Sequence, residues 1–241
     1  MAFGADMIHQ TSAALQRRSR AMHIFSIGAL FILALAVSAH LLYLFGVLQS
    51  EKFLLSSERG YAEFVQYGFA LIGAAAFLLL AAQQRRYAYV IPAMILAYVF
   101  IDDAFQLHEQ AGHLLAPFIN LTPFPHIPSN HVAEAIYLSA AGVISLACLG
   151  AAALRADASA QRNLAIFTIL LLLAGVCGVA ADAAGVLWGG RVISLIDDGG
   201  ELFFVMAIML FAVDLLGGSF PNDIGKNRHQ NREQDQPVDR T

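Results

Sequence analysis

The sequence has few charged residues. Asp, Glu, Lys and Arg make up 13% of its 241 residues, whereas a soluble domain carries roughly 25%. So little charge argues against an ordinary soluble enzyme, and also against a disordered or nucleic-acid-binding chain, because each of these classes needs charge for solvation or for phosphate contacts. Hydrophobic residues make up 58% of the chain. Together these fractions predict an integral membrane protein.

Cysteine is also scarce. Cys148 and Cys177 are the only two cysteines, too few for a disulfide framework or a thiolate metal site. The sequence also lacks a glycine-rich phosphate loop and a recognisable serine nucleophile motif.

Long apolar stretches dominate what is present. Each is long enough to cross a hydrocarbon layer, which takes about 20 helical residues. Their apolarity is continuous rather than alternating, which favours helices over a β-barrel. We predict an all-α fold, a bundle of six transmembrane helices. The predicted spans are Ile24–Leu48, Ala62–Ala82, Tyr87–Leu107, His131–Leu154, Leu164–Trp188 and Leu195–Leu216.

The first span resembles a signal peptide, because Arg17, Arg18 and Arg20 precede it and a Val37-Ser38-Ala39 sequence lies within it. Apolar residues continue beyond that point, however, for longer than the 7–15 residues or so of a signal core. We therefore interpret the span as an uncleaved anchor.

Basic residues predict the orientation of the bundle. Eleven of the fourteen Lys and Arg residues fall on one predicted side and three on the other. By the positive-inside rule, both termini are cytoplasmic, in a bacterial-type inner (plasma) membrane. The predicted organisation is a cytoplasmic segment over 1–23, a transmembrane domain over 24–218 and a disordered cytoplasmic tail over 219–241.

The loop over 110–130 lies on the predicted outer side. It contains no Asp, Glu, Lys or Arg, and it has four prolines among apolar residues. Such a segment does not suit free solution. We expect it to lie against the membrane surface or over the bundle, either as a lid or as an ordinary packed loop.

Ionisable residues gather at one level near the predicted outer face. Such a side chain inside a span costs about 2.5–3.5 kcal/mol on insertion scales, so each needs a reason. Asp102 and Asp103 lie in the outer third of the third span, and Asp182 in the outer third of the fifth. At these helix C-terminal ends the dipole opposes a carboxylate, which favours a functional role for Asp102 and Asp182.

Helix capping competes with function at the other carboxylates. Glu63, Glu134, Asp197 and Asp198 lie near predicted helix starts, where the dipole favours negative charge. Their spacing permits convergence, since His131 and Glu134 are three residues apart, as are Asp198 and Glu201.

Spacing also groups residues around the end of the third span. Asp102, Gln106, Glu109 and His113 share one face if the helix continues that far. His108 joins them only if the helix ends or kinks nearby. His40 on the first span is more typical of a hydrogen-bonded core histidine.

Several carboxylates cannot share a low-dielectric site unless cations or protons neutralise them. No Lys or Arg lies within these spans. A divalent metal is the simplest counter-charge, and the donor set fits Zn, Fe or Mn, with Ca possible; shared protons are the alternative. We predict Asp102, Glu109 and Asp182 as catalytic residues, and His108, His131, Glu134, Asp198, Glu201 and Glu63 as metal ligands; among the candidates, Glu63 and His40 are second choices.

The inner halves of the spans carry almost no ionisable residues. This favours a pocket that opens outward over a transport path through the membrane. We predict a metal-dependent enzyme acting on a lipid or other hydrophobic substrate, with hydrolysis preferred to oxidation. The alternatives are a non-enzymatic subunit or receptor, and a proton- or cation-coupled transporter. The sequence leaves the substrate and the oligomeric state open.

Overall fold

The computed structural model describes residues 2–119, 128–180 and 191–218. Within these ranges the chain forms helices and turns, without strands. Short single turns are η1 (Glu51–Phe53), η2 (Tyr87–Tyr89), η3 (Ala116–Phe118) and the π-helical η4 (Val176–Ala180). The α-helices are α1 (Ala2–Leu44), α2 (Tyr61–Gln84), α3 (Val90–Phe105), α4 (Leu107–Leu115), α5 (Ser129–Leu154), α6 (Ala158–Gly175) and α8 (Arg191–Gly218).

Among the described residues, six helical segments are long and apolar enough to cross a membrane, which agrees with the predicted number of spans. They lie close to the predicted positions. Their bounds are Arg20–Leu44, Tyr61–Gln84, Tyr87–Phe105, Ser129–Leu154, Ala158–Gly178 and Leu195–Gly218.

The predicted bounds are wrong at three places. The first span ends at Leu44 rather than Leu48. The third ends at Phe105, because Gln106 takes a left-handed conformation. The fifth begins at Ala158 rather than Leu164, because the Asp157 carboxylate accepts hydrogen bonds from two backbone N–H groups of the first turn. The end of that predicted span, like the 219–241 tail, lies outside the described residues.

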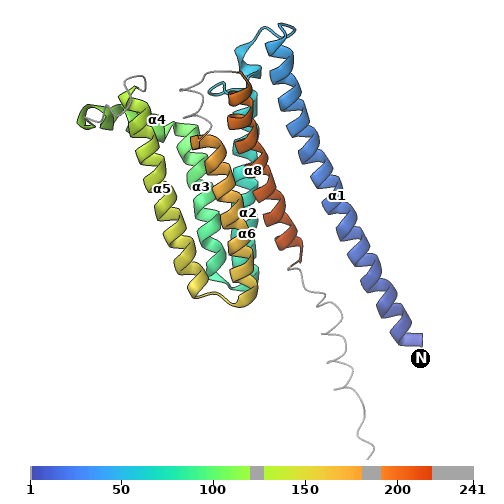
Figure 1. Cartoon of the computed structure of the whole chain (residues 1–241). Coiled ribbons are helices and arrows are strands. Elements are labelled where there is room, and N and C mark those ends of the chain that lie inside the picture. Colours follow the sequence, from blue (N-terminus) through green and yellow to red (C-terminus); the bar gives the residue numbers. More distant parts are fainter. Residues whose placement is uncertain (1, 120–127, 181–190, 219–241) are drawn as a thin grey trace, which may run out of the picture.

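Four helices form the centre of the bundle (Figure 1). α2 packs against α3 and α8, and α6 packs against α8. α1 runs along one side and contacts the bundle through α8, while α5 lies on the other side and is held mainly by α4. α4 lies at the end of the bundle where α3 ends and α5 begins. We call this the site end.

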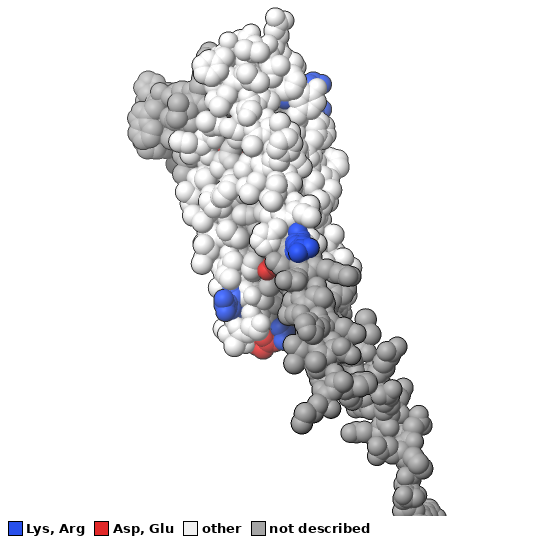
Figure 2. Space-filling model, turned by 90° about the vertical axis from the view of Figure 1, so that its right-hand side faces the viewer, with Lys and Arg blue, Asp and Glu red and all other residues white. Residues whose placement is uncertain are grey.

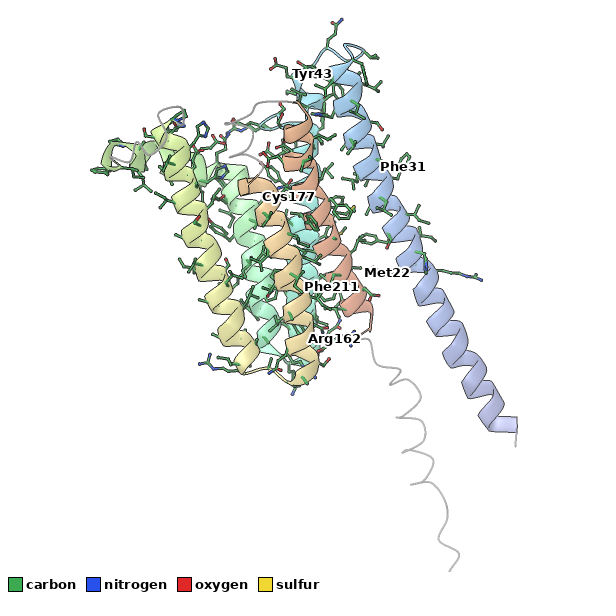
Figure 3. The ribbon with its side chains drawn as sticks, in the orientation of Figure 1. Met22, Phe31, Tyr43, Arg162, Cys177 and Phe211 are labelled. Carbon is green, nitrogen blue, oxygen red and sulfur yellow. The ribbon has the colours of Figure 1, made fainter. Side chains whose placement is uncertain are left out.

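Aromatic rings fill the half of the bundle away from the site end. The Phe77 ring packs edge-on against Phe167, with ring centroids 5.4 Å apart, and contacts the Tyr89 and Phe211 rings at 6.3 and 6.5 Å. Phe77, Phe167 and Tyr89 are almost completely buried. Figure 3 shows Phe211 and Arg162 in this half of the molecule and Cys177 nearer the site end. This half is an apolar core that joins α2, α3, α6 and α8.

The outer surface suits lipid. Large apolar side chains such as Phe31, Leu78, Val143 and Ile169 are more than half exposed. Figure 2 shows a broad band without charged side chains, with Lys and Arg above and below it. An uncharged band between charged ends is the pattern expected of a bundle in a bilayer.

The end opposite the site carries basic residues in its turns. Arg86 forms a salt bridge of 2.9 Å with Asp157, and Asn163 donates to the Tyr89 hydroxyl at 2.8 Å. The N-terminal end of α1 and the C-terminal end of α8 lie on this side of the bundle (Figure 1). These polar contacts connect α2 and α3 with the start of α6.

Candidate metal centre

The junction between α3 and α4 creates the centre. Gln106 has φ 52° and ψ 45°, a left-handed conformation that is uncommon for a residue with a side chain. Its backbone N–H donates to the carbonyl of Asp103 at 3.1 Å. The helix therefore stops and restarts in a new direction as α4.

This break brings Asp102 and His108 into contact. In a continuous helix, residues six positions apart point to well-separated directions. Here His108 Nδ1 lies 2.9 Å from Asp102 Oδ2. His108 was expected to join the cluster only if the helix ends or kinks nearby, and the helix does end there, at Phe105. The single face through Asp102, Gln106, Glu109 and His113 is wrong, because it requires an unbroken helix.

Asp103 completes a group of three potential ligands. One ligand atom each from Asp102, Asp103 and His108 lies within 4.8 Å of the others. Gln66 Nε2, on α2, donates to Asp103 Oδ2 at 3.2 Å. Two carboxylates and an imidazole at these separations can hold a divalent metal ion.

Asp102 is the most deeply buried member. Its side chain lies at the end of α3, and the residue is only 3% exposed. The Tyr98 hydroxyl, one turn earlier, donates to Asp102 Oδ1 at 3.4 Å. The Tyr137 hydroxyl on α5 lies 3.2 Å from the Tyr98 hydroxyl. Both Asp102 oxygens therefore have a partner.

Charge on α4 responds to these neighbours. The hydrogen bond that His108 donates to Asp102, together with the charges of Asp102, Asp103 and Glu109, raises the pKa of the His108 imidazole to about 9 against the opposing effect of burial. Burial and the nearby Glu58 carboxylate raise the pKa of Glu109. At neutral pH the metal-free centre therefore carries a proton on His108, which compensates part of the negative charge.

A cavity of about 170 Å³ opens beside the centre. It lies between the loop that precedes α2, the α3–α4 junction and the first turns of α8. Its wall is strongly acidic. The lining residues include Glu58, Glu63, Gln66, Asp103, Gln106, His108, Glu109, Asp198 and Glu201.

Gln106 connects the rim of this cavity. Its amide nitrogen donates to Glu58 Oε2 at 2.7 Å and to Glu109 Oε1 at 3.3 Å, and its amide oxygen accepts from Arg59 at 3.4 Å. Glu63 accepts from the Arg59 backbone N–H and from the Tyr67 hydroxyl. The loop before α2 is thereby held against the α3–α4 junction.

The cavity gathers most of the predicted site residues. Glu63, Glu109, Asp198 and Glu201 share its wall with His108. Glu63 lies in the first turn of α2, but the backbone N–H that it accepts belongs to Arg59, which precedes the helix. The capping alternative is wrong for Asp198, because α8 begins one to two turns earlier, at Arg191.

The remaining predicted residues lie elsewhere or outside the described ranges. His131 Nδ1 lies 3.2 Å from Glu134 Oε2, and neither residue lines the cavity. His40 is 1% exposed and accepts the Leu55 N–H at Nδ1, as expected of a core histidine. Asp182 lies outside the described residues.

Sequence reasoning assigned no role to Asp103. Its neighbour Asp102 had the same depth, and helical spacing placed Asp103 on a different face from Glu109. The adjacent pair of aspartates was the available signal. Tyr98 was likewise missed, because a single tyrosine within an apolar span carries no distinctive signal.

Comparison with known proteins identifies a family without an assigned activity. The family model described as a domain of unknown function, DUF8692, matches residues 23–215. The chain belongs to this family. No curated protein and no solved structure is significantly similar to it. The matched range includes four of the six apolar helices in full, all but the outermost three residues of the first and of the last, and Asp102, Asp103 and His108.

The donor atoms of Asp102, Asp103 and His108 determine which ions would suit this candidate centre. Carboxylate and imidazole ligands without thiolates are typical of Zn²⁺, Fe²⁺ and Mn²⁺ sites. Catalytic metal sites keep a coordination position open for water or substrate. The adjoining cavity provides space for such a ligand at Asp103 and His108.

Proposed function

We propose that this protein is a metal-dependent membrane enzyme, a hydrolase, whose divalent cation is bound at the cluster of Asp102, Asp103 and His108. The observation that carries the proposal is the convergence of these three side chains within 4.8 Å. Helical geometry alone does not bring them together, so the left-handed break at Gln106 is required. Because this break lies between Asp103 and His108, it supports a site in which the backbone is arranged to bring potential ligands together.

A divalent cation at this cluster supplies Lewis acidity and lowers the pKa of a bound water. The chain contributes a proton acceptor beside it. Glu109 lines the cavity, and burial and Glu58 raise its pKa towards the range in which a carboxylate exchanges protons effectively. Glu201 on the opposite wall is a second candidate acceptor.

The substrate we propose is a lipid or another hydrophobic molecule with a hydrolysable polar group. The cavity lies at one end of a bundle whose outer surface is apolar. Leu114 and Phe118, which follow His108 on α4 and η3, are 72% and 84% exposed. This places the centre beside apolar surface at the level of the helix ends. We further propose a bacterial inner membrane, with the centre on its outer face.

A non-enzymatic role is the second candidate, and one observation favours it. The Asp102–His108 contact of 2.9 Å already provides a counter-charge without a metal. In that case the acidic cavity serves a receptor or subunit that binds protons or an organic cation. Coupled transport is less favoured, because the half of the bundle beyond the centre is filled by apolar side chains.

Metal content separates these functions. Inductively coupled plasma mass spectrometry is performed on the detergent-purified protein and on Asp103→Asn with His108→Gln. The matched control is Asp214→Asn, which changes a carboxylate in the last turns of α8 far from the cavity lining. We expect about one metal per parent and control chain and almost none in the double variant. A folded parent without metal contradicts the enzyme proposal and supports the second candidate.

A further inference from the structure

Asp102 differs from the other two members of the cluster in its access to the cavity. Asp103 and His108 line the cavity, whereas Asp102 does not and is 3% exposed. Its two oxygens contact His108 Nδ1 at 2.9 Å and the Tyr98 hydroxyl at 3.4 Å. Asp102 therefore lies behind His108, as the carboxylate does in carboxylate–histidine–metal arrangements.

A carboxylate at Asp102 sets a direction for these hydrogen bonds. An ionised carboxylate only accepts, and a hydroxyl has a single proton to donate. The Tyr98 hydroxyl lies within reach of both Asp102 Oδ1, at 3.4 Å, and the Tyr137 hydroxyl, at 3.2 Å, but it has one proton. When that proton is given to Asp102, the Tyr137 hydroxyl donates to Tyr98. On the other oxygen, His108 Nδ1 must donate to Asp102. In the neutral imidazole, Nε2 then has the free lone pair.

We propose that Tyr137, Tyr98 and Asp102 form a hydrogen-bonded chain that positions His108, fixing its Nδ1–H tautomer so that Nε2 is the metal-binding atom. This inference rests on the proposed function for its metal and adds three positioning residues to it. Asp103 and His108 are then the ligands that touch the cation, and Asp102 acts through His108.

The hydrogen-bonded chain links residues of three helices, and the packing of these helices alone does not require such a link. Tyr137 is on α5, Tyr98 and Asp102 are on α3, and His108 is on α4. α5 buries few residues in the bundle, and Ala133 and Leu149 are its fully buried ones. The Tyr98–Tyr137 contact therefore provides a specific link from α5 to the centre.

Removal of single hydroxyls tests the chain. Tyr98→Phe, Tyr137→Phe and the double variant are compared with Tyr89→Phe. Tyr89 is a matched control, because its buried hydroxyl also has a hydrogen-bond partner, Asn163, but lies at the opposite end of the bundle. Mn²⁺ affinity is measured by equilibrium dialysis. The tautomer of His108 is read by ¹⁵N NMR of histidine-labelled, metal-free protein in which the imidazole is neutral, with His108→Gln to assign the signal.

We expect Tyr98→Phe to weaken Mn²⁺ binding roughly 10–100-fold, the usual effect of losing an outer partner of a ligand. Tyr137→Phe has a smaller effect. The double variant matches Tyr98→Phe, because Tyr137 acts through Tyr98. The ¹⁵N signals of Tyr98→Phe shift towards a mixture of tautomers, whereas Tyr89→Phe leaves affinity and signals unchanged.

Two results overturn parts of this account separately. If the parent binds Mn²⁺ and Tyr98→Phe behaves like Tyr89→Phe in both measurements, the positioning chain is wrong while the metal proposal stands. If the parent binds no metal, the proposed function fails. The ¹⁵N measurement on metal-free protein then tests the positioning of His108 without any metal. A tautomer shift in Tyr98→Phe supports the hydrogen-bonded chain, and an unchanged signal overturns it.

Discussion

Protons and metal ions compete for His108. Because Asp102 raises the pKa of His108 to about 9, the metal-free imidazole is protonated at neutral pH, and metal binding must release that proton. We therefore expect the apparent Mn²⁺ affinity to rise with pH by up to about tenfold per unit below the pKa, and to level off near pH 9. Equilibrium dialysis between pH 6.5 and 9 measures the slope.

His108→Gln is the control for this pH dependence, because glutamine does not titrate. Its residual affinity should lack the rise between pH 7 and 9. The sign also holds for stability without metal. A folded-state pKa above the unfolded value of 6.5 stabilises the protein below pH 6.5, and this contribution is lost as pH rises through about 9. A pH-independent affinity in the parent contradicts a role for His108 as a ligand.

At the residue scale, the sequence indicated how deep along the helices the centre lies, but it did not indicate which residues form the centre. Carboxylates at C-terminal helix ends are unfavourable, which marked Asp102 correctly as unusual. Its contact with His108 depends on the left-handed Gln106, and the surrounding residues include no Gly or Pro to signal a break. Pairing Asp103 with Gln66 depends on how α2 packs against α3, which local sequence does not determine.

At the scale of helices, α4 has to lie very close to α5. A Cβ added at Gly112 would lie 2.4 Å from Glu134 Cγ and 3.0 Å from the Asn130 carbonyl oxygen. Gly112→Ala therefore forces α4 away from α5, and His108 moves with it. We expect this variant to weaken Mn²⁺ binding at least tenfold, measured by equilibrium dialysis.

Gly142→Ala is the matched control for Gly112→Ala. Gly142 lies within α5, and an added Cβ would meet no atom within 4 Å. Alanine is favoured over glycine in a helix by up to about 1 kcal/mol. Gly142→Ala should therefore keep metal affinity and raise stability slightly. Equal metal affinity in the two variants contradicts the idea that close α4–α5 packing positions the centre.

The aromatic core should dominate the stability of the bundle. In lipid, helix association depends on packing rather than on transfer from water. Phe77→Ala leaves a cavity of roughly 100 Å³, which at about 24 cal/mol per Å³ costs about 2–3 kcal/mol. Unfolding by SDS in mixed micelles measures the difference. Leu78→Ala is the control, because the neighbouring Leu78 is 51% exposed, and it should lower the free energy of unfolding far less.

The apolar spans were predictable because twenty-residue apolar stretches have few structural alternatives in a bilayer. Helix ends were less predictable, for reasons specific to each. α6 starts at the Asp157 cap, which precedes the apolar stretch and is polar itself. α3 stops at Gln106 within a sequence that could continue as a helix. Hydropathy locates the membrane-embedded part of a helix but not its capping residues.

At the scale of the whole molecule, the distribution of basic residues predicts which end faces the cytoplasm. Arg85, Arg86, Arg155 and Arg162 lie in or beside the turns opposite the site end. From the positive-inside rule we predict that the cavity lies on the outer side. Single cysteines test this orientation, after Cys148→Ala and Cys177→Ala remove the native thiols. Ser50→Cys reports the site end and Ala158→Cys the opposite end, both at exposed positions.

In sealed right-side-out vesicles, we expect a membrane-impermeant maleimide to label Ser50→Cys at once and Ala158→Cys only after detergent is added. The reverse pattern would place the acidic cavity in the cytoplasm, where it would meet cytoplasmic ions and substrates from the inner leaflet.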